Sequence, residues 1–400
     1  MNPKKTFLKS YDSILLIIIF SLMITSIVAV YSASRNGQYN GDFVIKQSAF
    51  YLIGMIISIL VATIDINRIK KINWIIYGTC LSLLLILMFA PYSIARPVNG
   101  AKAWFQLPFF GTLQPSEFMK ISLIISISAV VDQHYKLYPI ANLKKDLILL
   151  SEILFITLPP ILIILIQPDT GMTMLLIVIS ISITLSSKIK LSLVVLLISI
   201  PALIVSALLV IISKFPVYFE RRMLSLLMPH QRSRIEGWLD PFAHTDAGFQ
   251  TKQGLLAIGT GQLSGKGYLN GSVYIPEEHT DFIFANIGEE FGFIGGAIVI
   301  TLFFLLLSRI INIALSALNH TNNLFGSMIC VGTISVLAFQ IFQNIGMTIG
   351  LLPVTGITLP FISYGGSSLL SNMILIGLTQ SVRNSYNDYM FYSSIGGKYG

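Results

Sequence analysis

The amino-acid sequence predicts an all-α polytopic membrane protein with about ten transmembrane helices. Hydrophobic residues make up 54% of the chain and charged residues only 11%, whereas a soluble protein carries roughly a quarter charged residues. The apolar residues gather in runs of about membrane-spanning length. Lysine and arginine concentrate in alternate connections between those runs, which is typical of a chain that crosses a membrane repeatedly.

The apolar runs define the elements in order, because a helix needs about twenty apolar residues to cross the hydrocarbon layer. The predicted spans cover residues 13–31, 45–64, 73–90, 116–131, 147–166, 170–187, 191–213, 282–307, 324–345 and 366–382. The fourth, sixth and tenth are short, so their ends are expected to move by several residues.

Positive residues predict the orientation, because cytoplasmic loops carry an excess of lysine and arginine. The relevant connections lie before the first span and after the second, fourth, sixth, eighth and tenth spans. Their cations are Lys4, Lys5, Lys9, Arg68, Lys70, Lys71, Lys136, Lys144, Lys145, Lys188, Lys190, Arg309, Arg383 and Lys398. These connections share one side if the span count is even, so we expect both termini in the cytoplasm.

The long connection after the seventh span, residues 214–281, is expected to be a large extracellular loop within a single integral membrane domain, residues 1–400. Long loops cross a membrane largely regardless of charge, so its basic residues do not oppose this placement. Within it, Gly254–Gly261 is apolar but too short to span. We interpret it as a half-helix at the membrane surface, packed against protein.

Three features have a second interpretation. The lysine-rich start and the apolar run to Val30 are similar to a signal peptide, but the later spans need this run to set their parity. Cys80 and Cys330 lie within apolar runs, which favours small buried residues over a disulfide or a metal site. The net charge of +8 is spread over short loops, so membrane orientation explains it better than nucleic-acid binding.

The segment 273–290 is dense in ionisable groups and leads directly into the eighth span. Asp281 is its predicted reactive group, because a partly buried carboxylate has a raised pKa and becomes a better base. His279 and two glutamates crowd the same point. The alternative is that Asp281 only caps the helix after Thr280. Glu289, about two turns deeper, and its neighbour are expected to face protein and to pair with a basic residue.

Polar side chains collect at the outward-facing ends of the spans. They are Trp104, Glu117, Lys120, Asp169, Asp281, Glu289, Glu290 and the turn Ser363–Ser368, with Ser367 and Ser368. Ionisable residues at membrane depth are costly and usually line a functional cavity, so we infer a polar cavity open to the outer face. Helix capping is the alternative for Asp169 and Glu117, which each follow a proline at the start of a span. Lys120 lies three residues after Glu117, on the same helical face.

Such a cavity, reached from water and from the lipid leaflet, suits a lipid-linked substrate with a phosphorylated, sugar-bearing head group. The loop arginines, among them Arg221 and Arg222, are expected to bind its phosphates by paired hydrogen bonds. Contact with anionic lipid head groups, or a solvated face, is the alternative. The sequence contains no His/Cys cluster spaced for zinc. A divalent cation, Mg²⁺ or Mn²⁺, held by one or two carboxylates and the substrate phosphates is the expected cofactor.

An ordered set of short motifs resembles the RodA/FtsW/SpoVE family of bacterial shape, elongation, division and sporulation proteins. The matching stretches are Gly100–Trp104, Gln114–Glu117 with Lys120, Gln167–Asp169, Trp238–Pro241, Pro276–Phe284, Gly288–Glu290, Pro353–Gly356 and Pro360–Ser368. They follow the family's order from the third span to the tenth. Each motif alone is modest, but the ordered set is highly specific.

The resemblance implies a peptidoglycan glycosyltransferase that polymerises lipid II at the outer face of the bacterial cytoplasmic membrane. By this similarity Asp281 matches the family's catalytic aspartate, and Trp104, Glu117 and Lys120 match positions that line its central cavity. Lys120 or Lys102 is expected to assist the reaction. The short loops and compact tail look most like the RodA branch, which serves cell-wall elongation and cell shape.

The family also works with a transpeptidase partner, a class B penicillin-binding protein, so the resemblance implies that partner together with lipid II and membrane lipid. Two other functions remain open. A lipid II flippase predicts polar residues on the cytoplasmic half of several spans, whereas the polar cluster found here is at the outer ends. A scaffold for the partner enzyme leaves the buried carboxylates unexplained.

Overall fold

The structure is a computed structural model that describes residues 11–35, 42–98, 100–107, 111–140, 142–243 and 248–396. Each predicted apolar run lies on a helix. The helices are α1 (Ser13–Arg35), α2 (Phe43–Thr63), α4 (Asn73–Phe89), α5 (Pro115–Leu137), α6 (Leu143–Ile166), α7 (Thr170–Ser186), α8 (Leu191–Lys214), α12 (Ile283–Thr321), α13 (Leu324–Thr348) and α14 (Gly366–Gly396). The prediction of a helical, polytopic chain is confirmed.

Length and hydropathy distinguish these helices. Among the described residues, six are long and apolar enough to cross a membrane on their own, namely α1, α2, α6, α8, α12 and α13, and α4 and α7 are shorter apolar helices. Helix α5 is less apolar than these helices because it carries Glu117, Lys120 and Asp132. All three side chains are buried inside the bundle. The count of ten spans therefore stays a prediction.

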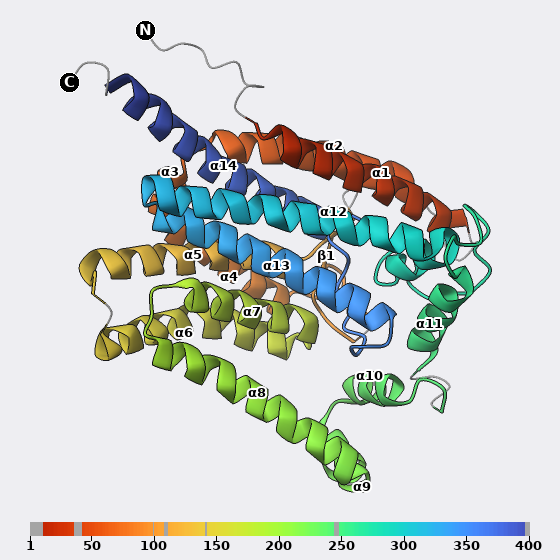
Figure 1. Ribbon diagram of the computed structural model, residues 1–400. Coiled ribbons are helices and arrows are strands. Elements are labelled where there is room, and N and C mark those ends of the chain that lie inside the picture. Colours follow the sequence, from red (N-terminus) through yellow and green to blue (C-terminus); the bar gives the residue numbers. More distant parts are fainter. Residues whose placement is uncertain are drawn as a thin grey trace.

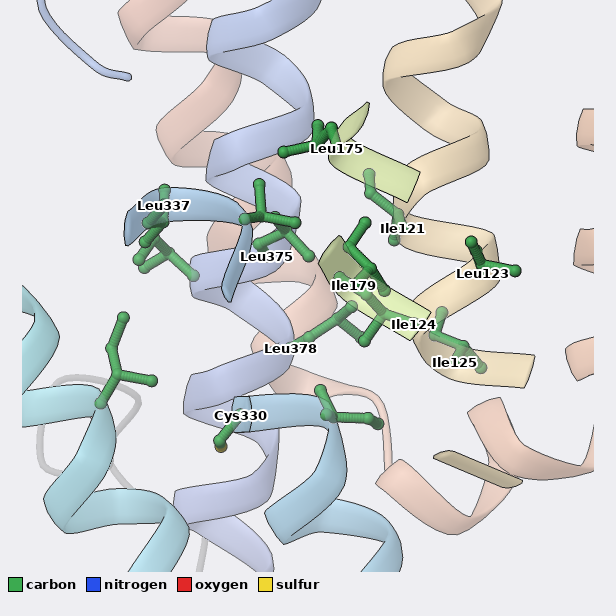
Figure 2. Packing of buried hydrophobic residues seen from close by; sticks show 14 of the residues in the cluster. Ile121, Leu123, Ile124, Ile125, Leu175, Ile179, Cys330, Leu337, Leu375 and Leu378 are labelled. Carbon is green, nitrogen blue, oxygen red and sulfur yellow. The ribbon is translucent and has the colours of Figure 1, made fainter. Parts of the chain in front are cut away.

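The core lies where α5, α7, α13 and α14 meet, and its side chains are almost all aliphatic. Figure 2 shows Ile124 of α5, Ile179 of α7 and Leu378 of α14 lying together in this cluster. Around it, α2 packs along α14, and α12 lies between α1 and α13 (Figure 1). Both cysteines are buried and free, as predicted.

Helix α8 diverges from this bundle (Figure 1). Leu193 is its one buried residue in the described chain, Val194 and Leu197 pack against the core, and most of its other apolar side chains are exposed. This exposure is typical of a lipid-facing helix, because an apolar surface that size is rare in water.

The long connection after α8 has helical structure. It contains α9 (Pro216–Tyr218), η2 (Phe219–Met223), η3 (Leu224–Leu226), α10 (Pro229–Leu239) and α11 (Phe249–Gly261). The predicted half-helix at residues 254–261 is thus the second part of α11, which packs against α12. Its depth in the membrane stays a prediction.

Smaller elements complete the chain. Helix α3 (Ile66–Lys71) joins α2 to α4, and β1 (Phe105–Leu107) pairs with β2 (Gly111–Leu113) in an antiparallel hairpin before α5. At the end of the bundle away from this hairpin, Asp12 before α1 accepts hydrogen bonds from Arg309 of α12 (2.6 and 2.9 Å). It also forms an ion pair with Arg383 of α14 (3.0 Å). Among the orienting residues, Lys4, Lys5, Lys9 and Lys398 lie outside the described part of the chain.

Candidate functional site

The backbone around Asp281 is bound from two neighbouring elements. Asn344 of α13 donates through its amide nitrogen to the carbonyls of Asp281 and Ile357, both at 2.8 Å. The Ser363 hydroxyl donates to the carbonyl of Thr280 (2.6 Å). Because these bonds use backbone atoms, they position residue 281 while leaving its side chain available.

The carboxylate of Asp281 is half-buried and, within the described residues, forms no hydrogen bond or ion pair. Its pKa is raised to about 7: burial is the largest cause, the negative charge of Glu277 adds to the rise, and the Arg234 guanidinium opposes it. Helix α12 has Phe282 at its N-cap position and no side-chain cap bond. The alternative that Asp281 serves as a helix cap is therefore wrong, and the group is a carboxylate that titrates near neutral pH.

His279 lies two residues before Asp281 but is packed into a ring cluster. Its imidazole packs against Phe43 (4.5 Å between ring centroids) and Tyr364 (5.7 Å), which also contact each other (4.9 Å). Burial lowers the pKa of His279, so the imidazole is neutral at pH 7 and does not contribute a cation to the site.

A second group of ionisable residues connects α5 to α14. Glu117 and Lys120 form a buried ion pair, as their spacing predicted. Ser371 donates to the Glu117 carboxylate (2.7 Å), and Lys120 donates to Asn372 (3.1 Å). A buried ion pair is tolerated only when further hydrogen bonds satisfy its remaining atoms, and these two bonds supply them.

Asp169 has the capping role that the sequence left open. It accepts from the backbone N–H of Met172 (3.0 Å), in the first turn of α7, and from the Gln114 amide (3.1 Å), just before α5. A side chain on Gly171 would come within 3.2 Å of the Thr355 carbonyl, so the start of α7 packs on the loop 353–358. The same loop reaches Asp281, since a Cβ on Gly356 would lie 3.4 Å from its Oδ2.

Arg234 joins these two regions electrostatically, because its positive charge acts on both Asp281 and Asp169. It lies on α10 one turn before Trp238, whose indole N–H donates to the Gly350 carbonyl at the end of α13 (3.2 Å). Residues four apart share a helix face, so the bond of Trp238 places the face of α10 that carries Arg234 against the end of α13. Arg232 instead pairs with Glu236 at the surface (2.6 Å).

The structure does not bring Arg221 and Arg222 to this cluster. They are exposed on η2, beyond the C-terminal end of α8, where η2 packs on α9 and η3. Sequence reasoning missed Arg234, because its position depends on the bond of Trp238 to Gly350, which is distant in the chain.

Most of the remaining predicted site residues have structural partners. Lys102 donates to the carbonyls of Met88 (3.1 Å) and Ala90 at the end of α4, and Trp104 is half-buried just before β1. Ser367 accepts from the Gln114 N–H and donates to the Thr112 carbonyl, both at 3.1 Å. Ser368 bonds to Thr358 (3.1 Å). Glu289 forms an ion pair with Lys266, which confirms its expected basic partner.

Fold and site together define a helical membrane protein with a cluster of ionisable groups around Asp281 and Asp169. A model of the FtsW/RodA/SpoVE family, described as "Cell cycle protein", matches residues 9–388. The chain belongs to this family, as the motifs predicted.

Individual relatives agree with this assignment. The chain is 34% identical to stage V sporulation protein E of Bacillus subtilis (strain 168), over 97% of this chain and 100% of the relative. It is also 34% identical to a probable peptidoglycan glycosyltransferase FtsW of Coxiella burnetii, over 94% and 97% of the two chains.

Solved structures share the fold. A chain from a structure described as "Structural coordination of polymerization and crosslinking by a peptidoglycan synthase complex" matches with a TM-score of 0.73 and 27% identity, over 94% of this chain and 98% of that chain. The rod shape determining protein RodA of Thermus thermophilus matches with a TM-score of 0.64 and 25% identity, over 93% and 96% of the chains. The matches include a stage V sporulation protein E, an FtsW and a RodA. The assignment of this chain to the RodA branch therefore stays a prediction.

Proposed function

We propose that this protein is a peptidoglycan glycosyltransferase that polymerises lipid II into glycan strands at the outer face of the cytoplasmic membrane. Family membership and the names of its relatives support the reaction class. The single observation that carries the residue assignment is the Asp281 carboxylate, half-buried, unpartnered among the described residues and with a pKa of about 7. A general base works best when its pKa lies near the operating pH.

The proposed chemistry is an inverting sugar transfer. Asp281 takes the proton from the 4-hydroxyl of one lipid II sugar. The oxygen forms a bond to the anomeric carbon of the second lipid II, or growing strand, as the bond from that carbon to the lipid diphosphate breaks. The diphosphate leaves with the bonding electron pair, and the Asp281 proton passes on to water.

Arg234 is the cation best placed to bind the leaving diphosphate, because its charge acts on the cluster around Asp281 and no described residue forms an ion pair with it. A guanidinium binds phosphate oxygens through two parallel hydrogen bonds. Lys120 and Lys102 are less suited to this role, since one is paired with Glu117 and the other with backbone carbonyls.

A divalent cation, Mg²⁺ or Mn²⁺, would neutralise charge on the departing diphosphate. The described residues contain no group of three His, Cys, Asp or Glu side chains that would bind a metal. One or two carboxylates together with the substrate's phosphates would hold such a cation, an arrangement that is common for Mg²⁺.

The proposed topology has ten transmembrane helices, both termini in the cytoplasm and residues 214–281 outside. It places Asp281 and Arg234 on the side where the lipid-linked sugar would be polymerised. We also propose a class B penicillin-binding protein as partner, which the similarity to a chain of a peptidoglycan synthase complex supports, and a role in elongation and cell shape.

Gel analysis of glycan strands tests this function, with the purified protein, its partner transpeptidase, lipid II and Mg²⁺. We expect polymer from the wild type and none from Asp281→Ala. Polymer from both would keep the transferase but assign the base elsewhere, with Glu117 the next candidate. No polymer from the wild type in an intact complex would reject the proposal in favour of a flippase or a scaffold.

A further inference from the structure

Helix α12 is interrupted at Gly292, where φ is +62° and ψ is −159°. In an unbroken helix the two N–H groups after Gly292 would bond to the carbonyls of Glu289 and Glu290. Residues 262–267 take over these bonds from outside the helix. The four replacements are Phe293 N–H to Gln262 O (2.9 Å), Ile294 N–H to Leu263 O (3.2 Å), Lys266 N–H to Glu289 O (3.0 Å) and Gly267 N–H to Glu290 O (3.0 Å).

The two backbones touch at this point, and glycine makes the contact possible. A Cβ on Gly292 would lie 2.4 Å from the nitrogen of Gly265, and a Cβ on Gly265 would lie 2.1 Å from the carbonyl oxygen of Glu290. Gly265 also has a φ of +79°, which only glycine adopts without strain. The segment 262–267 is therefore built into the helix break and does not lie loosely over it.

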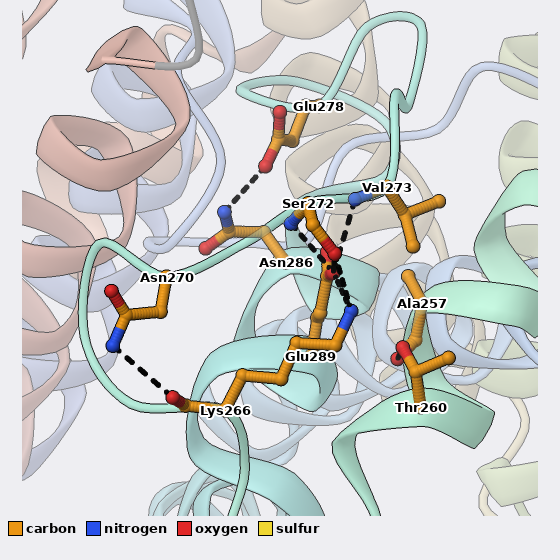
Figure 3. Close-up of polar contacts among 9 residues, drawn as sticks. All are labelled: Ala257, Thr260, Lys266, Asn270, Ser272, Val273, Glu278, Asn286 and Glu289. Carbon is orange, nitrogen blue, oxygen red and sulfur yellow. Dashed lines mark hydrogen bonds and ion pairs between the residues drawn. The ribbon is translucent and has the colours of Figure 1, made fainter.

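The side chain of Glu289 extends the same attachment (Figure 3). Its buried carboxylate pairs with Lys266 and accepts from the backbone N–H groups of Ser272 (2.9 Å) and Val273 (3.1 Å). On the next turn toward the N-terminus, Asn286 donates to the Glu278 carboxylate. We call residues 262–273 the strap, because they bind the first half of α12 along its length.

Asp281 lies between the two attachment points. Glu278 precedes it by three residues and is bonded to Asn286, and the half-helix 283–291 that follows it is bonded to the strap. A shift of this half-helix would therefore move the Asp281 carboxylate.

We propose that Glu289 is a positioning residue for the transferase reaction and acts through the strap, which sets the place of Asp281 against the substrate hydroxyl. This inference rests on the proposed function and corrects the expectation that Glu289 lines the substrate cavity. Its carboxylate is fully buried and already bound to the strap. It therefore affects the reaction without touching the substrate.

The expected effect is a loss of turnover at constant substrate affinity. A displacement of about 1 Å in a reacting group costs about 10²-fold in rate. We expect Glu289→Gln to lower kcat by about this factor while KM stays within about twofold. Gly265→Ala should act in the same direction, because it disturbs the strap without changing any charge.

Asp132→Asn is the matched control. Asp132 is also a buried carboxylate with lysine partners, Lys70 and Lys136, but it lies toward the far end of α5, fifteen residues beyond Glu117. It should lose similar stability and keep wild-type kcat.

The experiment combines glycan polymerisation kinetics with hydrogen exchange of the amides in residues 278–287, on the full chain in complex with its partner. Support requires a lower kcat and faster exchange there in Glu289→Gln and Gly265→Ala but not in Asp132→Asn. A higher KM at constant kcat, unchanged exchange, or an equal loss in the control would overturn the proposal. The exchange readout needs no activity, so it stays decisive if the proposed reaction is wrong.

Discussion

The pH dependence of polymerisation should respond in opposite directions to the two charges beside Asp281. The carboxylate must be ionised to take a proton, so the rate should fall as pH falls through its pKa of about 7. The rise of the Asp281 pKa from 3.8 to about 7 means that the site favours the protonated form by about 4 kcal/mol more than water does for an ordinary aspartate. Below the pKa the wild-type rate should fall about tenfold per pH unit, to about a tenth of its plateau at about pH 6.

Replacing Glu277 by glutamine removes a negative charge that raises the pKa of Asp281. The acidic limb of the rate profile should then move to lower pH, and activity at low pH should rise relative to the plateau. Arg234→Gln removes the charge that lowers this pKa, so the limb should move to higher pH. Burial is the largest cause of the raised pKa, so neither variant should restore an ordinary aspartate value.

The assay is the initial rate of glycan strand formation from lipid II between about pH 5.5 and about pH 8.5, reported as kcat/KM. Arg232→Gln is the control, because Arg232 is paired with Glu236 at the surface, and its profile should match the wild type. His279 should not produce the limb, since burial lowers its pKa. Shifts of both variants in the same direction, or a wild-type limb near pH 4, would refute the electrostatic account.

Three further results are expected. Glu117→Gln leaves the fully buried Lys120 without its counter-charge and should lower the free energy of unfolding by about 3 to 5 kcal/mol, measured by thermal unfolding in detergent. The double variant Glu117→Gln, Lys120→Met should recover most of the lost stability, and no recovery would argue against the ion pair. Trp238→Phe loses the bond to Gly350 that orients α10, so KM for lipid II should rise several-fold. An unchanged KM would show that the orientation of α10 does not affect substrate binding. Chelation of divalent cations should abolish polymer formation and Mg²⁺ or Mn²⁺ should restore it; full activity in chelator would remove the cation from the mechanism.

The helices were predictable because burial in lipid requires long apolar runs, and each run became a helix. The cap at Asp169 and the pair of Glu117 and Lys120 were equally accessible, since both depend on spacing within a single element. The importance of Asp281 could be recognised from the density of charge around it, together with the family motifs.

Features that depend on contacts between distant segments were not predictable. The break at Gly292 could not be located from the sequence, because the bonds that replace the helical ones come from the strap, which is distant in the chain. The orientation of Arg234 depends on the bond of Trp238 to Gly350, 112 residues away. Arg221 was predicted as one of the arginines of the long loop, and no local pattern indicates that it lies apart from the cluster.

The most direct test of the central claim is the polymerisation rate of Asp281→Asn relative to wild type, with both proteins in the same purified complex. Asparagine has nearly the same shape as aspartate but cannot accept the proton. The loss of a general base predicts a rate lower by about 10² to 10⁴-fold, with lipid II binding unchanged. A variant within about tenfold of the wild type would contradict the assignment of Asp281 as the base.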